Sequence, residues 1–131
     1  MDWRKEYSVG IPEIDEEHKG LLSCVTEIER ALESGNKGAM LHSAIGQLAH
    51  LTKAHFAVEE TLMRIEGYQN TDGHIEGHGI FSKALGTIEK KSLQDGLSIE
   101  DLDFMRTWLE MHFALDDKMY ATFVVRKDRK A

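Results

Sequence analysis

Apolar residues recur at helical spacing along most of the chain. In the stretch LHSAIGQLAHLTKAHFAVEETLMRI, apolar side chains return every three or four residues, as on one side of an α-helix. Polar stretches with glycines interrupt this pattern at three places, which indicates loops at residues 34–38, 66–73 and 93–98. Between these loops, the pattern predicts four helices, at residues 12–33, 38–65, 71–91 and 98–118.

Helices of about 20 residues joined by short connections pack as antiparallel neighbours. We therefore expect one domain, residues 1–131, with an all-α, up-down-up-down antiparallel four-helix bundle. Pro12 suits the first position of a helix, and Ser98 has an acidic residue three positions later, the spacing of a capping box. Residues 1–11 lack a helical pattern and are expected to form an N-terminal arm on the bundle. Residues 119–131 are expected to form a short C-terminal helix or tail.

Composition and charge narrow the range of functions. The net charge is −7 and acidic residues are spread along the chain, which argues against nucleic acid as a partner. The apolar runs are too short for membrane insertion. The N-terminal stretch MDWRKEYSVG has no apolar secretory segment, and the single cysteine, Cys24, excludes an internal disulfide. We expect a cytoplasmic monomer.

Seven histidines are many for 131 residues, and helical phase divides them into two groups. His42 and His50 fall on the side of their predicted helix opposite the leucines. The other five share the apolar side of their helices, with at least one from every helix: His18, His55, His74, His78 and His112. Glu59 lies in the same apolar stripe as His55, although the next residue, Glu60, falls on the solvent side.

One inward histidine is usually a core residue with a satisfied hydrogen bond. Five are harder to explain, because each buried polar group without a partner costs about 1–3 kcal/mol and a buried carboxylate costs more. A bound cation resolves both problems, since imidazoles donate lone pairs and a carboxylate can bridge two metal ions. The ligands are too many for one tetrahedral zinc and suit two metal ions. A ferritin-like site would carry two Glu-x-x-His motifs, which only DEEH at 15–18 approximates.

The sequence resembles the hemerythrin family, and specifically its single-domain bacterial members. The matching stretches are GIPEIDEEHKGLL, HFAVEE, HIEGH and HFALDD, and the resemblance covers about residues 1–120. It implies two iron ions joined by an oxo or hydroxo bridge, with O2 as the ligand. It also implies seven protein ligands: His74, His78 and His112 on one iron, His18 and His55 on the other, and Glu59 and Asp117 as bridges.

The fourth helix shows a conflict between helical phase and the family spacing. In an ideal helix Asp116 shares the face of His112, whereas Asp117 lies about 140° away. The resemblance nevertheless selects Asp117 as the bridge. Both His112 and Asp117 can reach the metals only if the helix widens locally, as in a π-type turn, or bends.

The family activity is reversible O2 binding, so the resemblance implies an O2 carrier, store or delivery protein rather than an enzyme. Its partner would be O2 and, in delivery, an O2-consuming enzyme. Two alternatives stay open: an O2 or redox sensor that works through a separate partner, and a di-iron enzyme such as a peroxidase, an oxidase or a detoxifier of iron or nitric oxide. O2 should bind at the iron with two histidines, in a pocket lined by apolar residues: Leu22, Leu51, Leu62 and Trp108.

Overall fold

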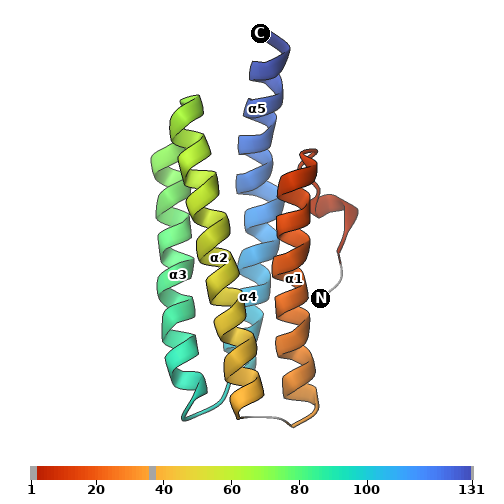
Figure 1. Ribbon diagram of the computed structural model, residues 1–131, viewed down its shortest axis with the longest axis vertical. Helices are drawn as coiled ribbons and strands as arrows, with labels where there is room; N and C mark the ends of the chain where they lie inside the picture. The colour runs from red at the N-terminus through yellow and green to blue at the C-terminus, as the bar shows by residue number, and fades with distance from the viewer. Residues whose placement is uncertain (1–2, 36–37, 131) are drawn as a thin grey trace.

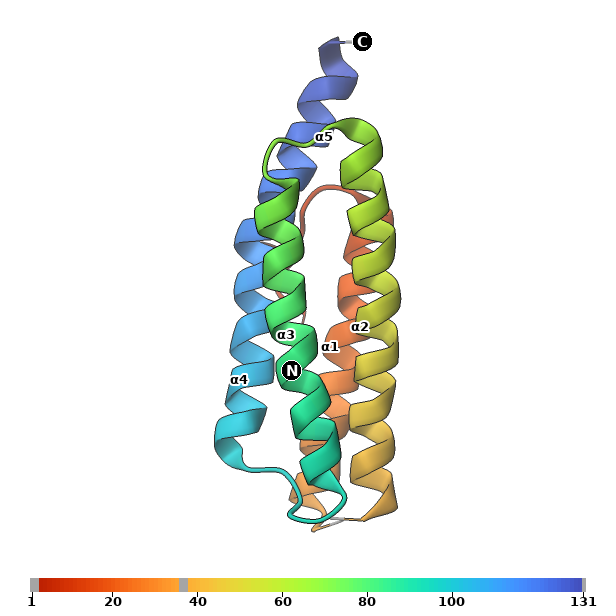
Figure 2. The ribbon, with the colours of Figure 1, turned by 90° about the vertical axis from the view of Figure 1, so that its left-hand side faces the viewer.

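A computed structural model describes residues 3–35 and 38–130, apart from the side chains of residues 129 and 130. The described chain is all-α, and its four long helical rods run up, down, up and down (Figure 1, Figure 2). In chain order, the elements are the 3-10 helix η1 (Lys5–Tyr7), α1 (Pro12–Glu33), α2 (Ala39–Glu66), α3 (Thr71–Ser92), α4 (Ile99–Met111), the π-helical segment η2 (His112–Asp117) and α5 (Lys118–Lys130). No helix in the described ranges is long and apolar enough to cross a membrane.

The helix ends have local causes. Helix α1 begins at Pro12, whose fixed φ and missing N–H suit a first helical position. The backbone N–H of Asp101 donates to Ser98 Oγ at 3.0 Å, so Ser98 caps α4 as its spacing predicts. Helix α2 ends at Gly67, whose φ of 71° is left-handed and therefore favours glycine.

Helical structure continues well beyond residue 118, the predicted end of the fourth helix. Helices α4 and α5 and segment η2 form one rod, and α5 projects past the connection between α2 and α3 (Figure 1). The continuation keeps an apolar side, because Tyr120 and Ala121 are buried. The Lys127 ammonium group also donates to the Glu66 carbonyl at the C-terminal end of α2, at 2.8 Å. Residues 119–130 are therefore helical rather than a tail.

The N-terminal arm is tied to the start of α1 by Asp15. One Asp15 oxygen accepts from the Ser8 hydroxyl at 2.7 Å, and the other accepts from the Val9 N–H at 2.8 Å. Tyr7 and Val9 are buried, so the arm packs its apolar side chains against the bundle.

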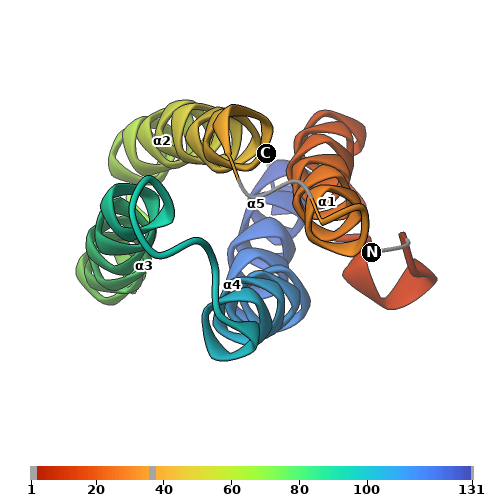
Figure 3. The same ribbon diagram turned by 90° about the horizontal axis from the view of Figure 1, so that it is seen from below.

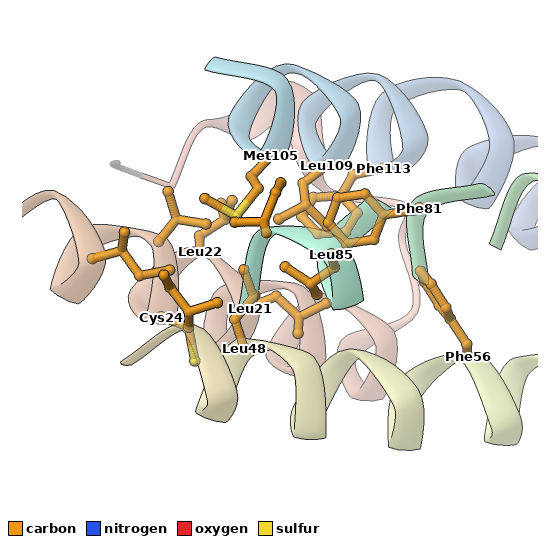
Figure 4. Close-up of a cluster of buried hydrophobic side chains, with 14 of the residues drawn as sticks. Leu21, Leu22, Cys24, Leu48, Phe56, Phe81, Leu85, Met105, Leu109 and Phe113 are labelled. Atoms are coloured by element: carbon orange, nitrogen blue, oxygen red, sulfur yellow. The ribbon is translucent and has the colours of Figure 1, made fainter. Parts of the chain in front are cut away.

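The apolar core fills the half of the bundle where α1 ends and α2 begins. Side chains from all four rods meet there (Figure 4). Its centre includes Leu21, Leu22, Val25, Ile28, Leu48, Leu85, Met105 and Leu109. Cys24 is buried at the edge of this cluster, as expected for a small apolar residue. The other half of the interior contains buried histidines and carboxylates among aromatic side chains.

Candidate metal centre

Seven side chains converge in the polar half of the interior, and every rod contributes at least one. They form two groups whose ligand atoms lie within 4.8 Å of one another: Glu59, His74, His78, His112 and Asp117 in the first, and His18, His55, Glu59 and Asp117 in the second. All seven are at most 4% exposed. The structure thus brings together all seven residues selected in the sequence. His42 and His50 belong to neither group.

The two carboxylates lie between the groups. Glu59 Oε1 is 2.6 Å from His74 Nε2 and 3.1 Å from His78 Nε2, whereas its Oε2 is 3.4 Å from His55 Nε2. Each group therefore faces a different oxygen of Glu59.

Asp117 is arranged in the same way. Its Oδ1 is 2.9 Å from His74 Nε2 and 3.0 Å from His112 Nε2, and its Oδ2 is 2.7 Å from His18 Nε2. A carboxylate that presents one oxygen to each group has the disposition of a bridge between two cations.

Buried lone pairs without a hydrogen bond test whether metal ions suit this cluster. His55 Nε2 and Glu59 Oε2 are both buried and have no hydrogen-bond partner among the described residues. The two carboxylates have ion-pair contacts there only with histidines, so no Lys or Arg of the described chain balances their charge. Buried acceptors without donors are costly, and cations accept these lone pairs. The donor set fits two metal ions.

The metal-free cluster holds protons instead. Burial opposes protonation of His112, but the charge of Asp117 and hydrogen bonds to Asp116 and Asp117 outweigh it and raise its pKa to about 11. Burial is outweighed in the same way at His55 and His74, whose carboxylate contacts raise the pKa of each to about 9. Protons and metal ions therefore compete for the same nitrogens.

Three further carboxylates support the imidazoles from outside. Each accepts a hydrogen bond from the outer nitrogen, Nδ1, of an inward histidine: Glu17 from His55 at 2.9 Å, Glu60 from His78 at 2.8 Å and Asp116 from His112 at 3.2 Å. A hydrogen on Nδ1 leaves the Nε2 lone pair directed into the cluster, and the nearby negative charge makes that nitrogen more basic.

The three outer carboxylates share a position in the sequence that helical phase alone does not reveal. Each stands next to an inward residue of the cluster, in the doublets Glu17–His18, Glu59–Glu60 and Asp116–Asp117. One member points in, and its neighbour reaches a histidine from the outside. A pair of adjacent polar residues at the edge of an apolar stripe is the sequence signal by which the outer carboxylates could have been predicted. His18 has no partner for its Nδ1 among the described residues.

The segment η2 explains how Asp117 reaches the interior. Residues His112–Asp117 are π-helical, so the predicted local widening of the fourth helix is confirmed. The wider turn carries Asp117 to the side of His112 and leaves it fully buried. Asp116, which ideal helical phase favoured, has a 54% exposed side chain and bonds to the outer side of His112.

Aromatic rings stack against three of the five imidazoles. Phe56 lies on His78 with ring centres 3.7 Å apart, Phe113 on His18 at 3.8 Å, and Trp108 on His112 at 4.5 Å. These rings fix the imidazole planes and cover them with apolar surface. The sequence did not single out Phe56 or Phe113, although each is adjacent to an inward histidine.

The predicted O2 pocket is partly wrong. Leu22 is buried and Trp108 stacks on His112, but Leu51 and Leu62 lie at the surface with 37% and 39% of their area exposed. The prediction took His55 as the middle of the buried stripe of α2. The buried residues of that helix centre about 50° from His55, whereas Leu51 and Leu62 lie about 40° and 20° on its other side.

Comparison with known proteins gives consistent matches along almost the whole chain. The family described as the hemerythrin HHE cation binding domain matches residues 9–124. A bacteriohemerythrin of Pseudomonas aeruginosa is 30% identical over 124 residues, which cover 93% of this chain and 80% of that protein. A bacteriohemerythrin of Clostridium acetobutylicum is 28% identical, covering 90% and 96%. Myohemerythrin-1 of Phascolopsis gouldii is 30% identical, covering 90% and 89%.

Proposed function

Because the chain belongs to the hemerythrin family, we propose that its buried cluster holds two iron ions and binds O2 reversibly. The protein would then act as a carrier, store or delivery protein for O2 and not as an enzyme. One observation carries the proposal: Glu59, Asp117 and the five inward histidines are all buried, and their ligand atoms converge in two groups, each within 4.8 Å. Iron and O2 binding are properties of the family to which the chain belongs.

We divide the residues between two metals according to the two groups of the cluster. His74, His78 and His112 would hold one iron, and His18 and His55 the other. Glu59 and Asp117 would contact both, since each presents one oxygen to each group. When bound, two ferrous ions would supply the two electrons and the open coordination position that O2 binding needs. The group with one histidine fewer is the natural location of that open position.

The surrounding residues favour reversible binding over turnover. Phe56, Phe113 and Trp108 cover the imidazoles with apolar surface, which excludes water and anions but admits a small neutral gas. Leu22, one turn after His18 and buried, would line the same pocket. The outer carboxylates hold the rings of His55, His78 and His112 in one orientation, with Nε2 directed into the cluster.

The decisive experiment combines metal analysis with optical spectroscopy. After anaerobic loading with ferrous iron, we expect two irons per chain. The reduced protein should develop a charge-transfer band in air and lose it again on removal of O2. A single tightly bound zinc per chain would contradict the metal assignment. Irreversible oxidation of the loaded protein in air, with consumption of O2 or peroxide in repeated cycles, would instead favour a di-iron enzyme.

A matched pair of variants sharpens this experiment. His78→Gln should lower the iron content, because His78 is buried in the cluster and solvent cannot replace its lone pair. His50→Gln should leave two irons in place, since His50 lies on the surface of the same bundle and outside both groups. Equal iron content in the two variants would count against the assigned site.

A further inference from the structure

Thr52 is a polar residue in the middle of the buried side of α2. It is 1% exposed, and its Oγ1 is buried without a hydrogen-bond partner among the described residues. A buried hydroxyl without a partner destabilises the folded protein, whereas a valine of nearly the same shape would not. The presence of a threonine at this position therefore calls for a partner that the described chain itself does not provide.

Four other threonines within the helices bond to their own backbone. Each donates its hydroxyl hydrogen to the carbonyl oxygen four residues earlier, at 2.8–3.3 Å, and these are Thr26, Thr61, Thr87 and Thr122. Ser92, which is buried as deeply as Thr52, donates to the Glu89 carbonyl at 2.6 Å. Thr52 has no bond of this kind, so its hydroxyl hydrogen is available to a group in the interior.

Thr52 belongs to a layer of side chains between the histidine cluster and the apolar core. Each rod contributes the residue one helical turn from an inward histidine, in the direction of that core. These residues are Leu22 after His18, Thr52 before His55, Phe81 after His78 and Leu109 before His112. All four are at most 2% exposed. Figure 3 looks along the bundle and shows the four rods around the interior that they share. Thr52 is the one polar member of this layer.

Within this layer, Leu22 and Thr52 are the members next to the group with two histidines. Side chains of an α-helix lean towards its N-terminus, so the His55 ring leans over the turn that contains Thr52. The β-carbons of two residues at this spacing are about 5–6 Å apart. His55 Nε2 is also buried without a hydrogen bond, so the two residues do not bond to each other. Both polar atoms therefore face the part of the interior where the proposed function locates the open coordination position.

We propose that the Thr52 hydroxyl donates a hydrogen bond to the small ligand bound beside His18 and His55, which is O2 or an anion that takes its place. This inference rests on the proposed function and adds a residue to it. A ligand with an acceptor atom satisfies the unpaired hydroxyl, and the hydrogen-bond donors of an O2 pocket determine how O2 is held. A hydroxyl is a weaker donor to anions than a cationic side chain, so Thr52 strengthens ligand binding without making the pocket a strong anion site.

Ligand affinity tests the hydrogen bond. Thr52→Val removes the hydroxyl and keeps the branched shape, so the dissociation constant of azide from the oxidised, iron-loaded protein should rise about 10-fold. Thr52→Ser keeps the hydroxyl and should bind azide within about threefold of the wild type. Thr61→Val, the same change at an exposed position of α2, should leave the affinity unaltered. Optical titration measures all four proteins, and equal affinities of the wild type and Thr52→Val would overturn the proposal.

Urea unfolding of the metal-free protein gives a readout that needs no ligand. Thr52→Val should unfold at a higher urea concentration than the wild type, because it removes a buried hydroxyl without a partner. Thr61→Val, which loses a hydrogen bond to the Ala57 carbonyl, should not. A lower midpoint for Thr52→Val than for the wild type would mean that the hydroxyl has a structural partner within the protein, and it would overturn the inference.

Failure of the proposed function would differ from failure of this inference in the protein that shows it. The former would appear in the wild type itself, as fewer than two irons per chain or as a loaded protein that binds neither azide nor O2, and it would overturn both. The latter would leave a wild type that binds two irons and azide, beside a Thr52→Val protein that binds azide equally well or is less stable without metal.

Discussion

Glu60 accepts a hydrogen bond at 2.8 Å from the outer nitrogen of His78, a ring whose other nitrogen faces the buried cluster. This pair explains why two glutamates stand together in HFAVEE. Glu59 enters the apolar stripe because it belongs to the cluster. Glu60 stays outside because it orients and polarises a histidine of the next helix. Two other pairs of neighbours are arranged in the same way. Glu17 and Asp116 lie outside and bond to histidine rings, whereas His18 and Asp117 belong to the cluster.

Replacing Glu60 by Gln tests this role. The variant keeps a hydrogen-bond acceptor for His78 but removes the negative charge beside the ring, so we expect metal affinity to fall about 10- to 100-fold. Competition with a chelator for ferrous iron measures the change. Glu76→Gln, at an exposed position of α3, removes an equal charge away from the cluster and should leave the affinity unaltered. Equal affinities of the two variants would mean that the Glu60 contact is only structural.

The doublet Asp116–Asp117 offers a second comparison. Asp117→Asn should reduce iron below two per chain, because Asp117 is fully buried and lies within 3.6 Å of histidines from both groups. Asp116→Asn should keep two irons and bind them more weakly, since its half-exposed side chain contacts only the outer nitrogen of His112. Iron analysis of both proteins after identical loading decides the matter. Loss of iron in Asp116→Asn but not in Asp117→Asn would reverse the two roles.

The metal-free protein should lose stability as the pH rises. The pKa of His55 and that of His74 are raised from 6.5 to about 9, and that of His112 to about 11. A pKa raised in the folded state contributes stability that is complete below about 6.5. That contribution disappears as the pH passes through about 9 and on towards 11. Urea denaturation of the metal-free protein between pH 6 and pH 10 measures this decline.

Iron loading should weaken this dependence on pH, because the metals replace the protons on the same nitrogens. For the same reason, iron uptake should release protons and become stronger as the pH rises through the same window. Isothermal titration in buffers with different ionisation enthalpies counts the released protons. Uptake without proton release at pH 7 would show that the imidazoles are neutral in the metal-free protein.

Whether the sequence could predict a residue of the site depended on where that residue lies relative to the apolar side of its helix. Six residues of the cluster lie on apolar stripes, where helical phase and the family motifs both select them, whereas Asp117 was selected by the family motif alone. Glu17, Glu60 and Asp116 are exposed or partly exposed, and phase alone classes them with the solvated side. Asp117 required the π-helical segment, which an ideal period of 3.6 residues cannot predict.

The error on α2 has an equally specific cause. Leu51 and Leu62 were assigned to the interior because His55, which lies at the edge of the buried stripe, was used as its centre. Beyond residue 118, where the sequence left a short helix or a tail open, the structure has the helix α5. Tyr120 is buried, but the positions from 126 to 128 are exposed and are held partly by the contact of Lys127 with Glu66.

The last prediction concerns the apolar cover of the group with two histidines. Phe113 lies flat on His18, with ring centres 3.8 Å apart and planes at 13°, and it is fully buried. Phe113→Ala should therefore leave a cavity beside His18 and lower the free energy of unfolding by about 3–5 kcal/mol. If the ring also keeps water and anions from the metals, the iron-loaded variant should oxidise irreversibly in air faster than the wild type, and azide should enter it faster.

Leu51→Ala is the control, because helical phase places Leu51 in this pocket whereas the residue lies on the surface. It should change neither the free energy of unfolding by more than about 0.5 kcal/mol nor the rate of oxidation. Both rates are to be measured at a temperature at which each variant is folded and holds its iron. A Phe113→Ala protein that is destabilised yet oxidises at the wild-type rate would show that the ring only fills space. In that case, the protection of the metals would depend on the rings over His78 and His112, from Phe56 and Trp108, where the same substitution can be tested next.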